Sequence, residues 1–142
     1  MPNLVLSRSP ESKADELEQL KATRIKEVNA KIGAVREEYI TPIPGQEMIY
    51  SAKEEEAKAF NVITPRPTDL SEFPFLDAEI GITAPSAQEL ADLWIQMAAD
   101  WRTIGPLLEQ LRLGTIEAVR AATTPAEIEQ AMIDLMNSLE GL

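Results

Sequence analysis

Apolar residues recur at alternating steps of four and three along residues 90–118, with polar residues between them. The repeating positions are Leu90, Trp94, Met97, Trp101, Ile104, Leu108, Leu111, Thr115 and Ala118. A repeat of 3.5 residues kept over about four heptads places its side chains on one narrow seam of a long helix. The pattern predicts that this seam packs against a partner helix, and its members from Leu90 to Leu111 are the candidate packing or oligomer interface.

Local signals predict where this helix starts and where it is interrupted. Ser86 and Glu89 have the spacing of a capping box, which marks a helix start. Gly105 and Pro106 interrupt the stripe, and a proline costs about 3 kcal/mol inside an ordinary helix. Either the helix kinks there and continues, or it ends and restarts with Pro106 in its first turn. The stripe keeps its phase across the interruption, which favours the kink.

Two further helices are predicted at the ends of the chain. Ser9 and Pro10 open the first, which is expected to run to about Tyr39 and to be stopped by the two prolines and the glycine of residues 41–45. Its narrow apolar stripe predicts an extended helix packed on one side. This stripe consists of Leu17, Leu20, Ile25, Val28, Ile32, Val35 and Tyr39. A second capping box, Thr124 to Glu127, opens the last helix, whose apolar positions are Ile128, Met132, Leu135, Leu139 and Leu142.

The middle of the chain combines a short helix with a proline-rich stretch. The helix is predicted from Gln46 to about Phe60, with Glu54 and Lys58 paired on its solvated face. Residues 61–85 contain four prolines and several apolar anchors, which predicts an ordered loop with one short turn at Leu76–Ile80. The stripes Ile25–Tyr39 and Ile128–Leu142 are candidate partners for the seam within the chain.

These patterns predict an all-α protein, an extended helical hairpin or bundle with long, coiled-coil-like amphipathic helices and an irregular middle. Three regions follow from it: an N-terminal extended helix (1–42), a short helix with an ordered loop (43–85) and a C-terminal helical hairpin that carries the heptad stripe (86–142). The apolar residues among positions 1–8 predict an edge extension or a mobile end.

Composition removes most kinds of catalytic and metal site. The chain has no cysteine and no histidine, so disulfides, thiolate metal sites and histidine general bases are excluded. No glycine-rich phosphate loop is present. Sequence reasoning therefore predicts no catalytic, cofactor-binding or metal-binding residues and no cofactor.

The net charge of −11 argues against nucleic acid and anionic membranes as partners, because both are polyanions. Residues 1–42 are neutral, so the whole excess of negative charge lies in residues 43–142. The first 20 residues lack the apolar run of a signal peptide, and no segment is long and apolar enough to span a bilayer, which predicts synthesis and folding in a cytoplasm.

Two sets of residues have side chains suited to catalysis or to ligand binding. The carboxylate pairs Glu37/Glu38 and Glu54/Glu56 could in principle perform acid/base catalysis, but a glycosidase-like site needs a cleft lined by aromatics. The chain has seven aromatic residues, and most are expected to be packing anchors, so no enzymatic activity is predicted. Trp94 and Trp101 could stack on a sugar or a base, but their heptad spacing is more typical of a core or an interface anchor.

Several loose motifs resemble a family of phage proteins. They read Pro44-Gly45-Gln46-x-x-Ile49-Tyr50-x-x-Lys53-x-x-Glu56-Ala57, then Phe73-Pro74-Phe75-Leu76-x-x-Glu79-x-Gly81, an alanine-rich helix with Trp101, Ile116-Glu117-x-x-Arg120 and Thr123-Thr124-Pro125-Ala126-Glu127-Ile128. Over about residues 15–136 the chain resembles small helical proteins, or C-terminal regions, encoded among bacteriophage tail genes beside tail-fibre and baseplate components. Gly45, Gln46, Tyr50, Lys53, Glu56 and Ala57 are the motif positions around the second helix, and we expect a structural role for them.

The resemblance implies a non-enzymatic structural protein of the virion tail, made in the host bacterial cytoplasm, with other tail or fibre proteins as partners. Fibre-like assemblies with heptad seams are often trimeric, so a homo-oligomer, with a trimer favoured, is expected. Two alternatives stay open: a tail-fibre assembly chaperone that binds fibre subunits transiently, and an intracellular helical scaffold or adaptor.

Overall fold

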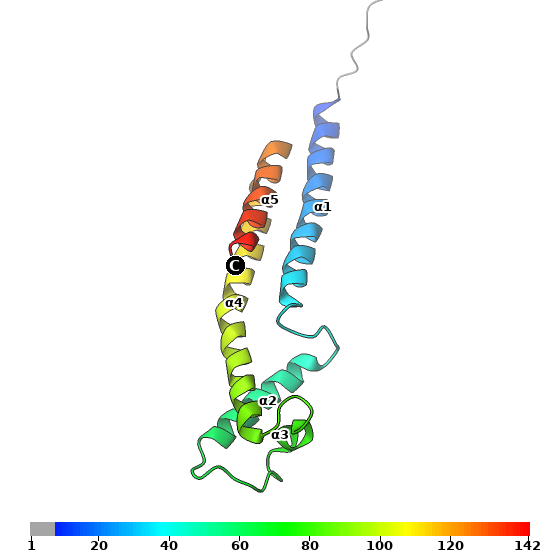
Figure 1. Cartoon of the computed structure of the whole chain (residues 1–142). Helices are drawn as coiled ribbons and strands as arrows, with labels where there is room; N and C mark the ends of the chain where they lie inside the picture. Colours follow the sequence, from blue (N-terminus) through cyan, green and yellow to red (C-terminus); the bar gives the residue numbers. More distant parts are fainter. Residues whose placement is uncertain (1–7) are drawn as a thin grey trace, which may run out of the picture. The chain divides into compact units, whose positions relative to one another are not determined.

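Helices make up the regular structure of residues 8–142, the part of the chain that the computed structural model describes (Figure 1). The five helices are α1 (Pro10–Arg36), α2 (Gln46–Asn61), α3 (Pro74–Glu79), α4 (Ala87–Ala121) and α5 (Pro125–Glu140). Within these residues the only β-type pairing is an isolated bridge between Ile80 and Ala84. The predicted all-α class is therefore confirmed for residues 8–142, whereas the expected extension at positions 1–8 lies, except for Arg8, outside the described residues.

The predicted N-caps form in all three places. In each, the side-chain oxygen of the cap residue accepts the backbone N–H of the residue three positions later. Ser9 accepts from Ser12 at 3.1 Å, Ser86 from Glu89 at 3.2 Å and Thr124 from Glu127 at 3.3 Å. The glutamates of the two boxes make different second bonds. Glu89 accepts the hydroxyl of Ser86, and Glu127 accepts the backbone N–H of Thr123, one residue before the cap.

Two helix boundaries differ from the predictions, and one of the two alternatives for α4 is excluded. Helix α1 ends at Arg36, three residues before the expected end at Tyr39. Helix α3 begins at Pro74, two residues before the expected turn, because proline is well suited to a first helical position. Helix α4 is continuous through Pro106, so the alternative of a helix that ends and restarts there is wrong.

Tertiary contacts regroup the three predicted regions into two units. Unit 1 comprises Met1–Arg36 and Leu107–Leu142, of which residues 8–36 and 107–142 are described, and unit 2 comprises Glu37–Pro106. Helix α4 contributes its first half to unit 2 and its second half to unit 1. Each unit is described by itself below.

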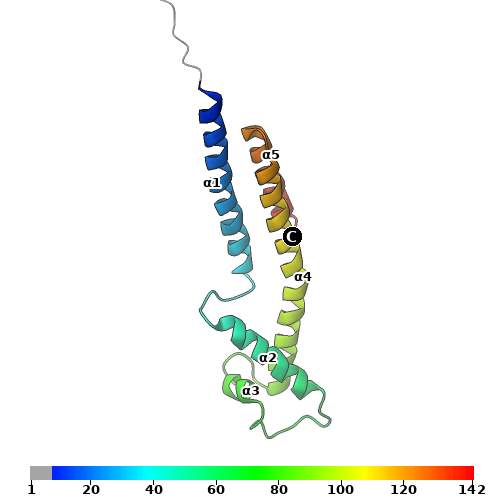
Figure 2. The same cartoon turned by 180° about the vertical axis from the view of Figure 1, so that it is seen from behind.

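Unit 1 consists of α1, the second half of α4 and α5. In both views α5 runs back along the second half of α4, and α1 lies beside them (Figures 1 and 2). The buried side chains come from all three helices: Val28, Ile32, Leu108, Thr115, Ile116, Val119, Ile128, Ala131, Met132 and Leu135. Ion pairs at the edge of this core join α1 to its neighbours, with Arg24 to Glu129 at 2.5 Å and Arg36 to Glu109 at 2.6 Å.

Glu109 is the most strongly perturbed carboxyl group of unit 1. Arg112 donates to both of its oxygens, at 2.6 and 2.9 Å, and Arg36 donates a third bond at 2.6 Å. The Arg112 bonds, with a smaller effect of Arg36, lower the pKa of Glu109 to about 2 against the opposing effect of desolvation. The carboxylate thus stays charged through the acidic range and ties α1 to α4.

This pKa predicts a pH-dependent contribution to stability. The folded pKa of about 2 lies below the ordinary value of 4.5, so the contribution is complete above pH 4.5 and is lost as the pH falls towards 2. Because Glu109 is partly exposed, we expect Glu109→Gln to lower the Tm at pH 7 by only about 2–4 °C. Thermal melts followed by circular dichroism from pH 7 to pH 2 should show this gap closing, whereas the control Glu117→Gln should change little. A gap that stayed constant to pH 2 would contradict the role of the Glu109 charge.

Unit 2 has its own hydrophobic core, built from α2, α3, the loop before α3 and the first half of α4. Its buried members are Ala57, Phe60, Phe73, Leu76, Leu90, Ala91 and Trp94. The rings of Phe60 and Phe73 meet edge to face, with centroids 5.6 Å apart. Glu56 of α2 holds α3 in place, since its carboxylate accepts the backbone N–H groups of Phe75 at 3.1 Å and Leu76 at 2.9 Å. The first turn of α3 is thus capped by a side chain from another helix.

Candidate functional site

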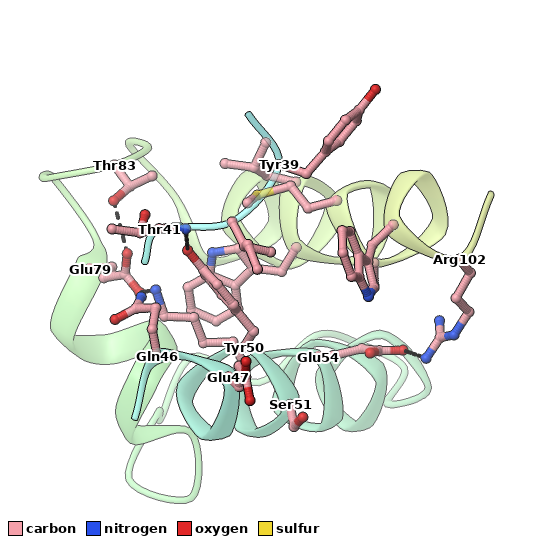
Figure 3. Close-up of a pocket in the computed structure, with 17 residues that line it drawn as sticks. Tyr39, Thr41, Gln46, Glu47, Tyr50, Ser51, Glu54, Glu79, Thr83 and Arg102 are labelled. Atoms are coloured by element: carbon pink, nitrogen blue, oxygen red, sulfur yellow. Dashed lines mark hydrogen bonds and ion pairs between the residues drawn. The ribbon is translucent and has the colours of Figure 1, made fainter. Parts of the chain in front are cut away.

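A pocket of about 580 Å³ lies between α2 and the first half of α4 in unit 2 (Figure 3). Helix α2 contributes Gln46, Tyr50 and Lys53 to its wall. These positions follow the helical spacing of four and three, so they share one face of α2. The segment 39–41, the first half of α4 and the turn after α3 complete the lining.

One end of the pocket is formed by a buried tryptophan and a satisfied ion pair. Trp94 is only 6% exposed, and the ammonium nitrogen of Lys53 lies 5.0 Å from the centroid of its ring. The same nitrogen pairs with Glu79 at 2.5 Å, and Glu79 accepts the hydroxyl of Thr83 at 2.9 Å. The cation–π contact and the ion pair together make this end a fixed wall with balanced charge.

Other side chains of the lining are apolar and partly exposed to solvent. Leu93, Met97 and Tyr39 are 39%, 41% and 40% exposed, and Trp101 is half-buried beside Tyr39, with ring centroids 6.5 Å apart. The phenol oxygen of Tyr50 accepts the backbone N–H of Thr41 at 3.0 Å, which fixes the segment that carries Tyr39 (Figure 3). The pKa of the Tyr50 phenol is lowered, because burial, which raises it, is outweighed by hydrogen bonds from Thr41 and Gln46.

Acidic side chains belong to the same lining. Glu54 pairs with Arg102 (Figure 3) and with Lys58, the latter at 2.6 Å. The bonds from Lys58 and Arg102 lower the pKa of Glu54 despite the opposing effect of burial. The Glu54–Lys58 pair was predicted from the sequence and is confirmed. Glu47 also lines the pocket, and it is exposed and forms no hydrogen bond or ion pair with any residue between 8 and 142. The pocket therefore offers one unpaired carboxylate.

The structure divides the predicted seam by burial. Leu90, Trp94, Ile104 and Leu108 are buried, Trp101 and Leu111 are half-buried, and Met97 is exposed. Leu90 and Trp94 pack against residues of α2 and α3, neither of which was a predicted partner of the seam. Periodicity gave no information on which element covers each residue of the seam.

The motif positions around α2 serve the pocket and the core. Gln46, Tyr50 and Lys53 line the pocket, and Ala57 is buried in the core. Gly45 precedes α2 with φ of +84°, a conformation that favours glycine. Glu56 caps α3 from α2, a role that sequence reasoning did not find because its partners lie 19 and 20 residues away.

The two carboxylate pairs lie in different surroundings. Glu54 is engaged by two cations, and Glu56 accepts two backbone N–H groups. Glu37 and Glu38 are exposed in the turn after α1.

Among residues 8–142, no group of three or more acidic side chains is arranged to hold a metal ion. No helix in the same range has the length and apolar character needed to cross a bilayer.

Several residues of the pocket were missed by sequence reasoning. Tyr39 was assigned to the first helix, and Leu93 and Arg102 lie beside the heptad stripe and not on it. Their only signal was a large apolar or charged side chain one position from a stripe member.

In comparisons with known proteins, no family model matches the chain, and no curated protein or solved structure is significantly similar to it.

Proposed function

We propose that the chain is a non-enzymatic structural protein of a bacteriophage tail, which attaches fibre or baseplate components through helix packing. One observation carries this proposal: folding buries only part of the seam and leaves the rest accessible to solvent. Leu90 and Trp94 are buried in unit 2, whereas Met97 and its neighbours Leu93 and Trp101 are accessible around a pocket. Apolar and aromatic side chains exposed around a concavity are typical of protein docking sites.

The resemblance of the motifs to tail-gene products supplies the biological setting of the proposal. On this proposal, the protein belongs to the virion tail after synthesis in the host cytoplasm. Mass spectrometry of purified particles, from a phage whose genome encodes this chain, should detect it in stoichiometric amounts. Its absence from infectious particles would overturn the structural role. Absence together with co-purification with free fibre subunits would favour the alternative, an assembly chaperone, and binding to host proteins alone would favour a scaffold or adaptor.

A homo-oligomer, with a trimer favoured, is the second part of the proposal. Unit 1 exposes several large apolar side chains along α4 and α5 and just after α5: Leu107, Leu113, Ile133, Met136 and Leu142. Ile133 and Met136 are three positions apart and therefore share one face of α5. Burial of such a face between copies, in a coiled-coil-like seam, would remove it from water.

The oligomer is tested by placing charges on this face. Light scattering of the wild type should give about three times the chain mass of 15.7 kDa. The double variant Ile133→Lys/Met136→Lys should give a single chain mass with unchanged helical content, because two charges cannot be buried between copies. Ser138→Lys is the control for added charge, because this exposed position of the same helix lies two residues from Met136 and five from Ile133 and so points away from their shared face. A monomeric wild type would contradict the proposed oligomer.

A further inference from the structure

We infer that the pocket of unit 2 is a docking site for a partner segment that presents an apolar side chain and an arginine on one face. The inference deepens the proposed attachment role, on which it rests for the existence of a partner, by naming the chemistry of that partner. It is carried by the charge of unit 2, by the free carboxylate of Glu47 and by the accessible ring of Trp101.

Unit 2 is strongly acidic and its own cations are mostly engaged. Residues 37–106 contain 13 acidic and four basic side chains. Three of these four bases, Lys53, Lys58 and Arg102, form ion pairs with carboxylates of unit 2. Most of the net charge of −11 therefore lies in this unit, and its field attracts a cationic partner and repels an anionic one.

The two tryptophans of the pocket differ in what they offer to a ligand. Trp94 is buried, and Lys53 of the same unit already lies over its ring. Trp101 is half-buried among the exposed side chains of Leu93, Met97 and Tyr39. The ring of Trp101, together with Leu93 and Met97, can therefore receive an apolar side chain from outside.

Arginine suits the unpaired carboxylate of Glu47 better than lysine does. Its planar guanidinium can pair with a carboxylate through two parallel bonds. Glu47 supplies the carboxylate, and Leu93 and Met97 supply the apolar surface for a second side chain of the same segment. A volume of about 580 Å³ lies in the range of pockets that hold a few side chains or a small molecule.

The test uses the full chain and a synthetic probe. The probe is a blocked helical peptide of alanine and glutamine with one leucine and one arginine four positions apart, compared with a peptide that has glutamate in place of arginine. The readout is the indole N–H signals of the two tryptophans in ¹H–¹⁵N NMR spectra, assigned with Trp101→Phe. We expect a saturable shift of the Trp101 signal with the arginine peptide, a much smaller shift of Trp94, and affinity for the glutamate peptide at least about tenfold weaker.

Matched variants separate the pocket from the general field of the unit. Glu47→Gln should weaken the arginine peptide by about threefold to tenfold, whereas Glu55→Gln, on the same helix but outside the pocket, should leave affinity unchanged. Equal losses in both variants, equal binding of both peptides, or no shift at millimolar peptide would each overturn the inference. None of these outcomes bears on whether the chain is found in virions, so the two proposals can fail separately.

Discussion

Replacing Phe60 by alanine is expected to destabilise unit 2 by about 3–5 kcal/mol, the largest effect of any single substitution considered for this protein. Phe60 is 2% exposed and packs edge to face on Phe73 in the core that also contains Leu76 and Leu90. Truncation removes the aromatic contact and leaves a cavity that neighbouring helices can fill only in part.

Tryptophan fluorescence is a direct measure of this effect. The two tryptophans of the chain, Trp94 and Trp101, both belong to unit 2, so their emission during urea denaturation reports on this unit. Val62→Ala is the matched control, because Val62 is 80% exposed just after the same helix and should change stability by less than about 0.5 kcal/mol. Equal midpoints for the two variants would show that the Phe60–Phe73 contact does not support the unit.

Replacing Glu56 by alanine is expected to cost about 2–3 kcal/mol, because two backbone N–H groups of α3 lose a charged acceptor at once. Helix α3 has no side-chain cap of its own, since its N-cap residue is Phe73. Glu56 replaces that cap through bonds to Phe75 and Leu76. The negative charge also lies at the positive end of the helix dipole.

Hydrogen exchange measures this effect directly at the two backbone amides that Glu56 binds. The amides of Phe75 and Leu76 should exchange faster in Glu56→Ala, and the fluorescence-detected urea midpoint should fall. Glu56→Gln keeps one acceptor oxygen and should lose about 1 kcal/mol, an intermediate effect. Glu55→Ala, which removes an exposed neighbouring carboxylate, is the control. Unchanged exchange of both amides in Glu56→Ala would show that solvent or another group satisfies them.

Local sequence signals were sufficient for most helix boundaries. The caps at Ser9, Ser86 and Thr124 use bonds to an amide three residues away, so a short stretch of sequence contains both partners. Continuity of α4 through Pro106 could not be decided in the same way. A proline destabilises a helix by about 3 kcal/mol, and tertiary packing elsewhere along the helix determines whether this loss of stability is offset.

The candidate site was much less accessible to sequence reasoning. Its lining brings together α2, the first half of α4, the turn after α3 and the segment 39–41, which are far apart in the chain. The motif around α2 did contain Gln46, Tyr50 and Lys53, but nothing in their spacing indicated a pocket opposite them. Pairing of Lys53 with Glu79 and of Glu54 with Arg102 depends on which helices lie side by side.

By itself, the sequence determined the all-helical class, the starts of α1, α2, α4 and α5, the apolar stripe along α4 and the absence of cysteine and histidine chemistry. The tertiary structure alone decided that Leu90 and Trp94 pack on α2 and α3, that Glu56 caps α3, and that Met97 and Trp101 remain accessible beside a pocket. The physical reason is the separation along the sequence over which each interaction acts. Propensity, capping and periodicity act over a few neighbouring residues, whereas burial and ion pairing depend on residues that only folding brings together.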